Sequence, residues 1–236
     1  MSSEQPVVFT KENLDQYLKA LGKEFRKLNG TSIPAEIILV GGASILANYG
    51  FREMTTDIDA LIYASSTMKD AINHVGDMFG LPNGWLNSDF MSSSSYSPKL
   101  DEVSVYYKTF SNILKIRTIS AEYLIAMKLR SGRRYKNDLS DIIGILYAQQ
   151  KNGTPLSMEI IYNAVVELYG EWDSLPENSR IFINDAFKIE DYKKFYADCT
   201  ANELHAKNSL VYFEKDYPGI TTESNVNDIL ASLKKK

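Results

Sequence analysis

The sequence predicts an α+β protein, in which a small mixed sheet with flanking helices is followed by a helical C-terminal domain. Up to residue 119, short apolar runs typical of strands alternate with segments of helical periodicity. From Ser120 onward, every segment has helical periodicity. The change in pattern places a boundary near 118–121. We therefore expect an α+β domain with an N-terminal helix over 1–119 and a helical domain over 120–236.

Three helices and four strands are expected in the first domain. Apolar residues at helical spacing predict a long helix over 11–29. A short helix over 43–50 is expected to end at Gly50, and another over 66–80 is expected to end at Gly80. The strands are expected at 36–41, 57–63, 103–110 and 112–119, with the last two joined near 111–112.

The other segments are a long loop and the helices of the second domain. Residues 81–100 are predicted to be a polar loop, because the stretch contains two prolines, a glycine and four consecutive serines. The helices of the second domain are expected at 120–132, 138–150, 157–170, 176–187, 189–206 and 223–234.

The composition narrows the class of protein. The chain has 236 residues, of which 44% are hydrophobic and 24% are charged, and this is ordinary for a globular protein with a sizeable core. Its single cysteine, Cys199, excludes an intrachain disulfide framework and is typical of a reducing compartment. The first residues lack a signal-peptide pattern, and no apolar stretch is long enough to span a membrane. We therefore expect a cytoplasmic protein.

Positive charge is concentrated in one part of this acidic chain. The net charge is -4, but the segment 115–136 contains one acid, Glu122, and seven basic residues. We call these the basic residues of 115–136: Lys115, Arg117, Lys128, Arg130, Arg133, Arg134 and Lys136. Such a concentration of charge is typical either of a solvated helix face or of a site for a polyanion.

The stretch 41-GGASILANYG-50 begins with two glycines at the end of a predicted strand. Gly41 and Gly42 would let a phosphate approach the backbone closely at the start of the next helix. Ser44 would add a hydroxyl group to such a site. The stretch is not a Walker A loop, because no Gly-Lys-Ser/Thr follows. An ordinary strand–helix turn is the alternative.

Two aspartates follow one residue apart on the next predicted strand. Asp57 and Asp59 are expected to face the same way, with Ile58 pointing into the core. Two adjacent carboxylates repel each other unless a cation lies between them. Mg²⁺ or Mn²⁺ fits, because these ions take oxygen ligands and are commonly shared with substrate phosphates. The alternative is an edge strand with two solvated aspartates.

These residues carry a family resemblance. The pattern Gly-Gly-x-Ser, a short helix and then Thr-Thr-Asp-Ile-Asp resembles the first motif of the nucleotidyltransferase superfamily with the DNA polymerase β-like fold. The stretch 120-SAEYLIAMKLRSGRRYKNDLSDIIGIL-146 is similar to one branch of it, the AbiEii-type toxins of bacterial toxin–antitoxin systems and related nucleotidyltransferases. The resemblance covers about 35–147.

The resemblance implies roles for residues in both domains. Lys128 aligns with a family lysine that contacts the triphosphate or the reacting phosphoryl group. Asp138 aligns with a catalytic or metal-orienting carboxylate, and Asp141 is the alternative. Arg133 and Lys136 lie with Arg134 on the connecting turn, where they are expected to bind the nucleotide or a polyanionic acceptor. The helical domain is expected to complete the active-site cleft.

The activity implied is Mg²⁺-dependent transfer of a nucleoside monophosphate from a nucleoside triphosphate to an acceptor hydroxyl. RNA, a protein or a small molecule could supply the acceptor, and the branch implies an antitoxin protein as a partner. One feature departs from the family pattern: Lys115 and Arg117 occupy the polar positions of the strand 112–119, where many members carry a third acid. A catalytically inactive nucleotide-binding or interaction module of the same fold is therefore the alternative.

Overall fold

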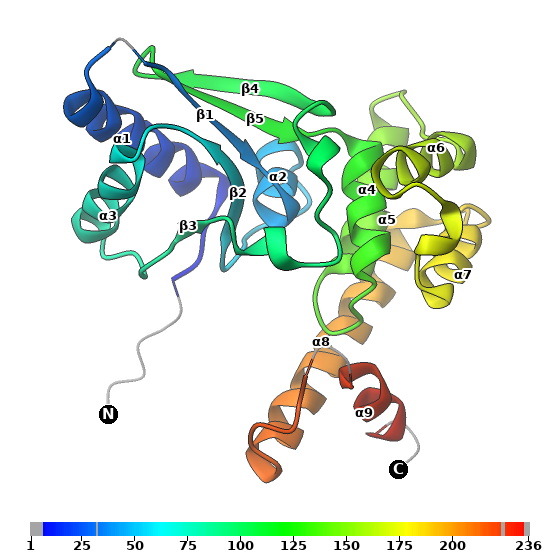
Figure 1. Cartoon of the computed structure of the whole chain (residues 1–236). Helices are drawn as coiled ribbons and strands as arrows, with labels where there is room; N and C mark the ends of the chain where they lie inside the picture. The colour runs from blue at the N-terminus through cyan, green and yellow to red at the C-terminus, as the bar shows by residue number, and fades with distance from the viewer. Residues whose placement is uncertain (1–6, 32, 223–224, 234–236) are drawn as a thin grey trace. The chain divides into compact units, whose positions relative to one another are not determined.

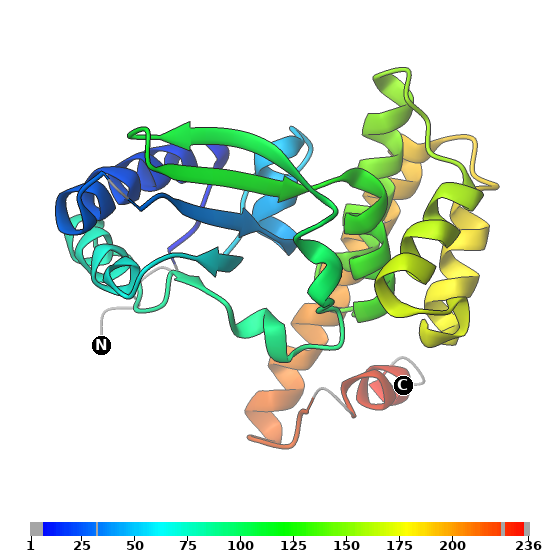
Figure 2. The ribbon, with the colours of Figure 1, turned by 45° about the horizontal axis from the view of Figure 1, so that its top comes forward.

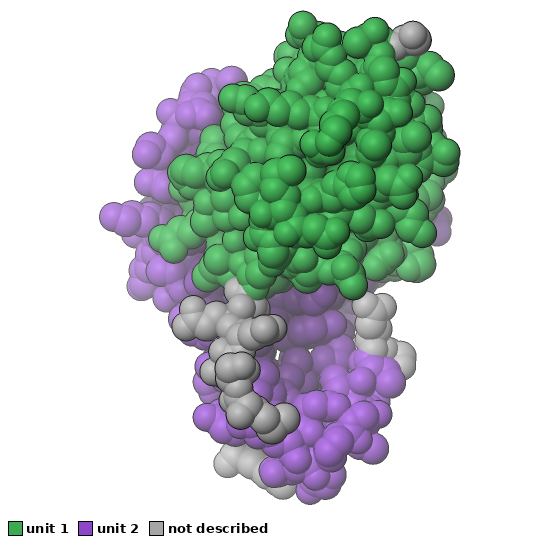
Figure 3. Space-filling view, turned by 90° about the vertical axis from the view of Figure 1, so that its left-hand side faces the viewer, with its two compact units in different colours: residues 1–124 green, residues 125–236 purple. Residues whose placement is uncertain are grey.

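The chain divides into two compact units, unit 1 over Met1–Leu124 and unit 2 over Ile125–Lys236 (Figure 3). The computed structural model describes residues 7–31, 33–222 and 225–233. Unit 1 is mixed α+β and unit 2 is helical, which confirms the predicted fold class. The division between the units falls inside helix α4 (Ala121–Ser131), a few residues after the boundary expected from the sequence.

Unit 1 is built on a five-stranded mixed sheet with the strand order β3-β2-β1-β5-β4 (Figure 2). The strands are β1 (Ala35–Leu39), β2 (Ile58–Tyr63), β3 (Leu86–Asn87), β4 (Ser104–Phe110) and β5 (Leu114–Ile119). β1 is antiparallel to β2 and parallel to β5. β3 lies inside the stretch 81–100, which the sequence predicted to be only loop. The prediction missed this strand because two residues are too few to show an alternating pattern.

Helices α1 (Lys11–Asn29) and α3 (Thr67–Phe79) pack together beside the sheet (Figure 1). Their apolar sides share one core with alternate residues of the central strands, as the strand period of two requires. The sheet residues in this core include Ile37, Leu39, Ile58, Ala60, Leu114 and Ile116. Thr10 and Asn13 form a capping box at the start of α1, which explains why this helix begins where the sequence predicted.

Helix α2 (Gly41–Asn48) begins at the glycine pair itself, two residues earlier than expected. The prediction that Gly50 ends this helix was wrong. Tyr49 takes the C-cap position in an extended conformation, with its N–H donating to Ile45 O at 2.8 Å. The helix therefore ends without a residue in the left-handed backbone conformation.

The hairpin between β4 and β5 turns where the sequence predicted. Ser111 and Asn112 both have positive φ, at 53° and 54°. Two consecutive residues of this kind are typical of the tight turn whose twist matches antiparallel strands.

Unit 2 contains the helical segments α5 (Asp138–Lys151), α6 (Met158–Tyr169), α7 (Glu177–Ala186), α8 (Tyr192–Asp216) and α9 (Val226–Leu233), with the last part of α4. α8 extends well beyond residue 206, where the sequence predicted its end. No glycine or proline occurs between Tyr192 and Pro218, so no strong helix-stop residue ends the helix earlier. α5 packs against α8. α9 packs against the C-terminal half of α8 through Leu210 of α8 and Leu230 of α9. No helix among the described residues is long and apolar enough to cross a membrane.

Candidate active site

The glycine pair lies where β1 passes directly into α2. Gly41 has φ of 52°, in the left-handed region that favours glycine. A Cβ on Gly42 would lie 2.7 Å from Thr55 Oγ1 and 3.0 Å from Arg52 Nη2, so these neighbours leave no room for a side chain. The backbone conformation at Gly41 and the close side chains at Gly42 therefore both favour glycine. The turn also has a guanidinium group beside it, from Arg52, a residue that the sequence analysis missed.

Ser44 has a structural role in this conformation. Its side chain has no exposed surface, and its hydroxyl oxygen accepts the Ile119 N–H at 3.0 Å. Asn48, one turn further along α2, donates its side-chain amide to Ile119 O at 3.3 Å. Both contacts join α2 to the end of β5. Ser44 was expected to contact a nucleotide through its hydroxyl. The position of the hydroxyl does not favour that contact, because it is buried and already bonded to Ile119.

Asp57 and Asp59 flank a fully buried residue at the start of β2. Ile58 has no exposed surface, whereas Asp57 is exposed and Asp59 is partly exposed. This alternation places the two carboxylates on the same side of the strand. The Thr55 hydroxyl donates to Asp57 Oδ1 at 3.2 Å, so the residue that packs on Gly42 also contacts the first aspartate.

The part of the chain that the structure describes places no third acid with this pair at a metal site. Among the residues that the structure describes, no group of three or more His, Cys, Asp or Glu side chains could hold a metal ion. On β5, Lys115 and Arg117 each lie 2.8 Å from a carboxylate oxygen of Glu36, and Arg117 also contacts Asp101 at 3.0 Å. The ion pairs of Lys115 and Arg117 therefore stabilise the sheet.

Two partly or fully exposed carboxylates fit a hard cation that takes its other ligands from water and substrate phosphates. Mg²⁺ is commonly held in this way, by one or two protein carboxylates. Asp57 and Asp59 are therefore chemically suited to such an ion, although they do not form a closed protein site.

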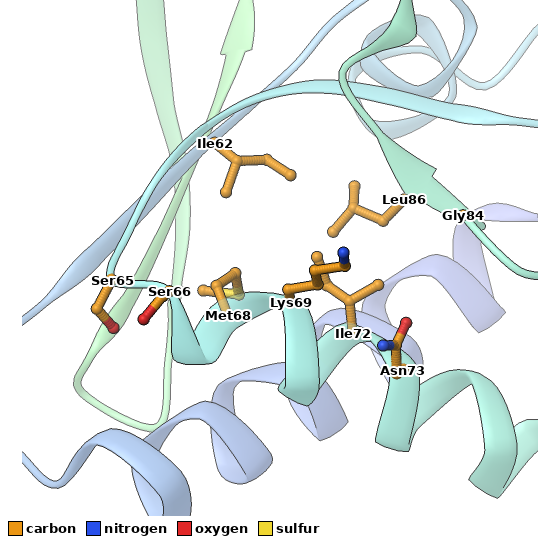
Figure 4. A pocket seen from close by; sticks show the side chains of 9 residues that line it. All are labelled: Ile62, Ser65, Ser66, Met68, Lys69, Ile72, Asn73, Gly84 and Leu86. Atoms are coloured by element: carbon orange, nitrogen blue, oxygen red, sulfur yellow. The ribbon is translucent and has the colours of Figure 1, made fainter.

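A cavity of about 410 Å³ lies elsewhere in unit 1 (Figure 4). Ile62 and Leu86 point into it from the strands, and Met68 and Ile72 line it from α3 (Figure 4). Ile62 and Asp59 are three residues apart on β2, so they face opposite sides of the sheet. The cavity is therefore separate from the aspartate pair.

In unit 2, Lys128 is buried between two carboxylates. It is 7% exposed, and its Nζ lies 2.7 Å from Asp138 Oδ1 and 2.8 Å from Asp141 Oδ2. Arg133 adds a second cation, with its Nε 2.9 Å from Asp138 Oδ2. Asp138 and Asp141, which the sequence left as alternatives, thus share the same lysine. We call Lys128, Arg133, Asp138 and Asp141 the lysine cluster.

The electrostatics of this cluster keep Asp138 ionised. Burial alone would raise the pKa of Asp138, but the Lys128 ammonium and the Arg133 guanidinium lower that pKa well below its ordinary value. Asp138 is therefore a poor proton acceptor near neutral pH, and its chemistry suits the positioning of Lys128 and Arg133.

Glu203, on α8, is a second residue that the sequence analysis missed. Its Oε1 accepts the N–H groups of Leu139 at 2.7 Å and Ser140 at 3.3 Å, in the first turn of α5. Burial raises the pKa of Glu203 to about 7; the hydrogen bonds oppose this shift and the negative charge of Asp141 adds to it. The spacing in the sequence offers a sign of this role. Glu203 is an acid at helical spacing between Cys199 and Ala206, on the buried side of α8.

Several of the basic residues of 115–136 are ion-paired within their own units. These are Lys115 and Arg117 in unit 1, and Lys128 and Arg133 in unit 2. Arg130 lies over the ring of Tyr169, 5.6 Å from its centroid. Lys136, expected to bind the nucleotide, is exposed. The charge concentration in the sequence is therefore largely balanced by partners from other segments.

The comparison with protein families agrees with the resemblance to nucleotidyltransferases. The profile of a family described as nucleotidyltransferases of unknown function (DUF6036) matches residues 16–176, which include both the glycine–aspartate motif and the lysine cluster. Comparisons with curated proteins and with solved structures gave no match. The match spans well over half of the chain, and the chain therefore belongs to this family of nucleotidyltransferases.

Proposed function

We propose that this protein is a Mg²⁺-dependent nucleotidyltransferase, which moves a nucleoside monophosphate from a nucleoside triphosphate to an acceptor hydroxyl. The observation that carries the proposal is the pair Asp57 and Asp59 on one side of β2, in a chain of a nucleotidyltransferase family. Two adjacent carboxylates repel each other on a strand, whereas a cation shared with substrate phosphates is commonly held by one or two such groups.

The residues of unit 1 would bind the metal and the phosphates. Asp57 and Asp59 would hold Mg²⁺ or Mn²⁺. When bound, this ion would neutralise part of the negative charge of the phosphates. The first turn of α2, at Gly41 and Gly42, offers backbone N–H groups and a partial positive charge to the phosphates. Arg52, beside Gly42, would add a full positive charge.

The reaction is a substitution at the α-phosphorus. The acceptor oxygen forms a bond to that phosphorus, the bond to the bridging oxygen of the β-phosphate breaks, and pyrophosphate leaves while the hydroxyl proton passes to water. Placement of the two reactants and stabilisation of the transferring group supply most of the rate in reactions of this class.

Lys128 would take part through the lysine cluster. Its ammonium contacts two carboxylates in the described conformation, so contact with a phosphate oxygen requires it to exchange one aspartate for the phosphate. Asp138, which keeps contacts to both Lys128 and Arg133, would hold the cluster together during such an exchange. Arg133 and Lys136 lie on the turn just before α5 and would contribute charge toward the nucleotide.

RNA, a protein hydroxyl and a small molecule all remain as acceptors in this proposal. The assignment to the AbiEii-like branch, a toxin role and an antitoxin partner rest on the likeness of the stretch 120–146 alone. Dependence of the reaction on an added acceptor is the property that separates these alternatives.

The test is release of pyrophosphate with Mg²⁺ and each of the four nucleoside triphosphates, with and without total cellular RNA. Asp57→Asn and Asp59→Asn should each abolish release. Asp77→Asn, which removes an exposed carboxylate from α3, is the matched control and should leave release unchanged. Equal release by the wild type and both site variants would refute the proposal.

A nucleotide-binding module without catalysis is the second candidate, and the absence of an acid from β5 favours it. Such a module would be stabilised by Mg²⁺ and a nucleoside triphosphate in thermal unfolding but would release no pyrophosphate. Loss of that stabilisation in Asp57→Asn would place the bound nucleotide at the aspartate pair.

A further inference from the structure

The first turn of α5 is capped by a residue from a distant helix. Asn137, at the N-cap position, makes no side-chain cap hydrogen bond. Glu203 supplies the missing acceptor instead, because its Oε1 accepts the N–H groups of Leu139 and Ser140. An anion at this place also interacts favourably with the helix dipole. Glu203 thus does for α5 what a local cap does for most helices.

The same turn carries both aspartates of the lysine cluster. Asp138 is the first residue of α5 and Asp141 lies one turn further on, and both contact Lys128. The position of this turn therefore decides where the two carboxylates hold the ammonium group. Through its two hydrogen bonds, Glu203 fixes that turn against α8.

A neutral side chain would make the same cap without a buried charge. Glu203 is 4% exposed, and its Oε2 has no hydrogen-bond partner among the described residues. A glutamine could accept the same two N–H groups through its carbonyl oxygen and would avoid the cost of burying a carboxylate. Hydrogen bonding to the first turn of α5 therefore does not by itself require an ionisable side chain at this position.

Ionisation of Glu203 would change the net charge around Lys128. The lysine cluster contains two cations and two carboxylates, so it is balanced by itself. Asp141 on α5 and Cys199 on α8 are the titratable groups whose charges act with that of Glu203. Burial, with Glu203 and Asp198 nearby, raises the pKa of the Cys199 thiol to about 12, so Cys199 stays neutral near pH 7.

We infer that Glu203 is a positioning residue for Lys128: it holds the first turn of α5, and its ionisation gives the lysine cluster and Glu203 together a net negative charge. This role in activity rests on the proposed nucleotidyl transfer. A net negative charge at this place opposes the approach of a triphosphate, so KM for the nucleotide should rise as Glu203 ionises. An effect on the order of threefold to tenfold is expected for one partly screened charge.

The experiment compares the full-length wild type, Glu203→Gln and Glu203→Ala, with Glu190→Gln as a matched control that removes an exposed carboxylate. The pH dependence of KM and kcat for pyrophosphate release is measured between pH 6 and 9. We expect the rise in KM of the wild type to persist in the control and to disappear in Glu203→Gln. Glu203→Ala should lower kcat because the turn is released, and Glu203→Gln should restore it.

Urea unfolding over the same pH range provides a readout that does not depend on activity. If Glu203→Gln changes the pH dependence of unfolding but KM keeps its rise, Glu203 is a structural cap and the inference is overturned. If the wild type releases no pyrophosphate with any nucleotide or acceptor, the proposed function fails and the role in activity fails with it. In that case unfolding still decides separately whether Glu203 ionises and caps α5.

Discussion

Lys128 Nζ lies 2.7 Å from Asp138 Oδ1, and both side chains are almost completely removed from water. A buried charge is tolerated only when a partner compensates it, so each residue depends on the other. The lysine expected to contact a phosphate is therefore also a structural element of unit 2.

Asp138→Asn should destabilise the protein by about 3–5 kcal/mol, because it leaves the Lys128 and Arg133 charges with less compensation in a buried site. Urea unfolding at pH 7 measures the change. Asp77→Asn, at an exposed position of α3, should change the free energy of unfolding by less than about 0.5 kcal/mol. A similar small effect for both variants would show that the ion pair contributes nothing.

Glu203 should make the protein less stable as the pH rises toward neutrality. Its folded-state pKa, about 7, lies above the ordinary value of 4.5, so the folded state holds a proton that the unfolded state has lost in this range. The free energy of unfolding should fall by about 3 kcal/mol between these two pH values from this group alone. Glu203→Gln should remove that part of the fall, and Glu190→Gln should retain it.

Gly42→Ala should destabilise unit 1 by about 1–3 kcal/mol, because its Cβ would lie 2.7 Å from Thr55 Oγ1. Gly50→Ala is the matched control in the same segment, because no atom lies within 4 Å of the added Cβ. Thermal or urea unfolding of both variants compares them directly. Equal stability would mean that Thr55 and Arg52 move aside without cost.

Ser44→Ala should cost about 1–3 kcal/mol of stability, because the Ile119 N–H would lose its acceptor inside the protein. The folded variant should bind nucleotide as the wild type does, since the Ser44 hydroxyl is buried. Ser66→Ala is the control, because the Ser66 side chain makes no cap hydrogen bond at α3. Weaker nucleotide binding by folded Ser44→Ala, with Mg²⁺ present, would instead restore a direct role for the hydroxyl.

The local pattern of the sequence determined most of the fold. Periodicity and end signals predicted α1 and α3 closely, and Ser111–Asn112 were expected as the hairpin turn. The alternation of Asp57, Ile58 and Asp59 followed from the strand period alone. These features depend on neighbours in the chain, which a sequence shows directly.

Only the tertiary structure decided which charges are paired. The basic residues of 115–136 look like one cluster in the sequence, yet Glu36 compensates Lys115 and Arg117, and Asp138 compensates Lys128 and Arg133. Ion pairs depend on distances in space, and Glu36, the shared partner of Lys115 and Arg117, lies far away from them in the chain.

Glu203 shows most clearly that packing between distant segments decides such contacts. It caps a helix that begins more than sixty positions earlier, and that contact exists only because α8 packs on α5. Helical periodicity placed Glu203 on a helix, but it did not reveal what that helix packs against. The sequence by itself determined most of the secondary structure and the aspartate pair, while packing between distant segments decided the environment of Lys128 and the ionisation of Asp138 and Glu203.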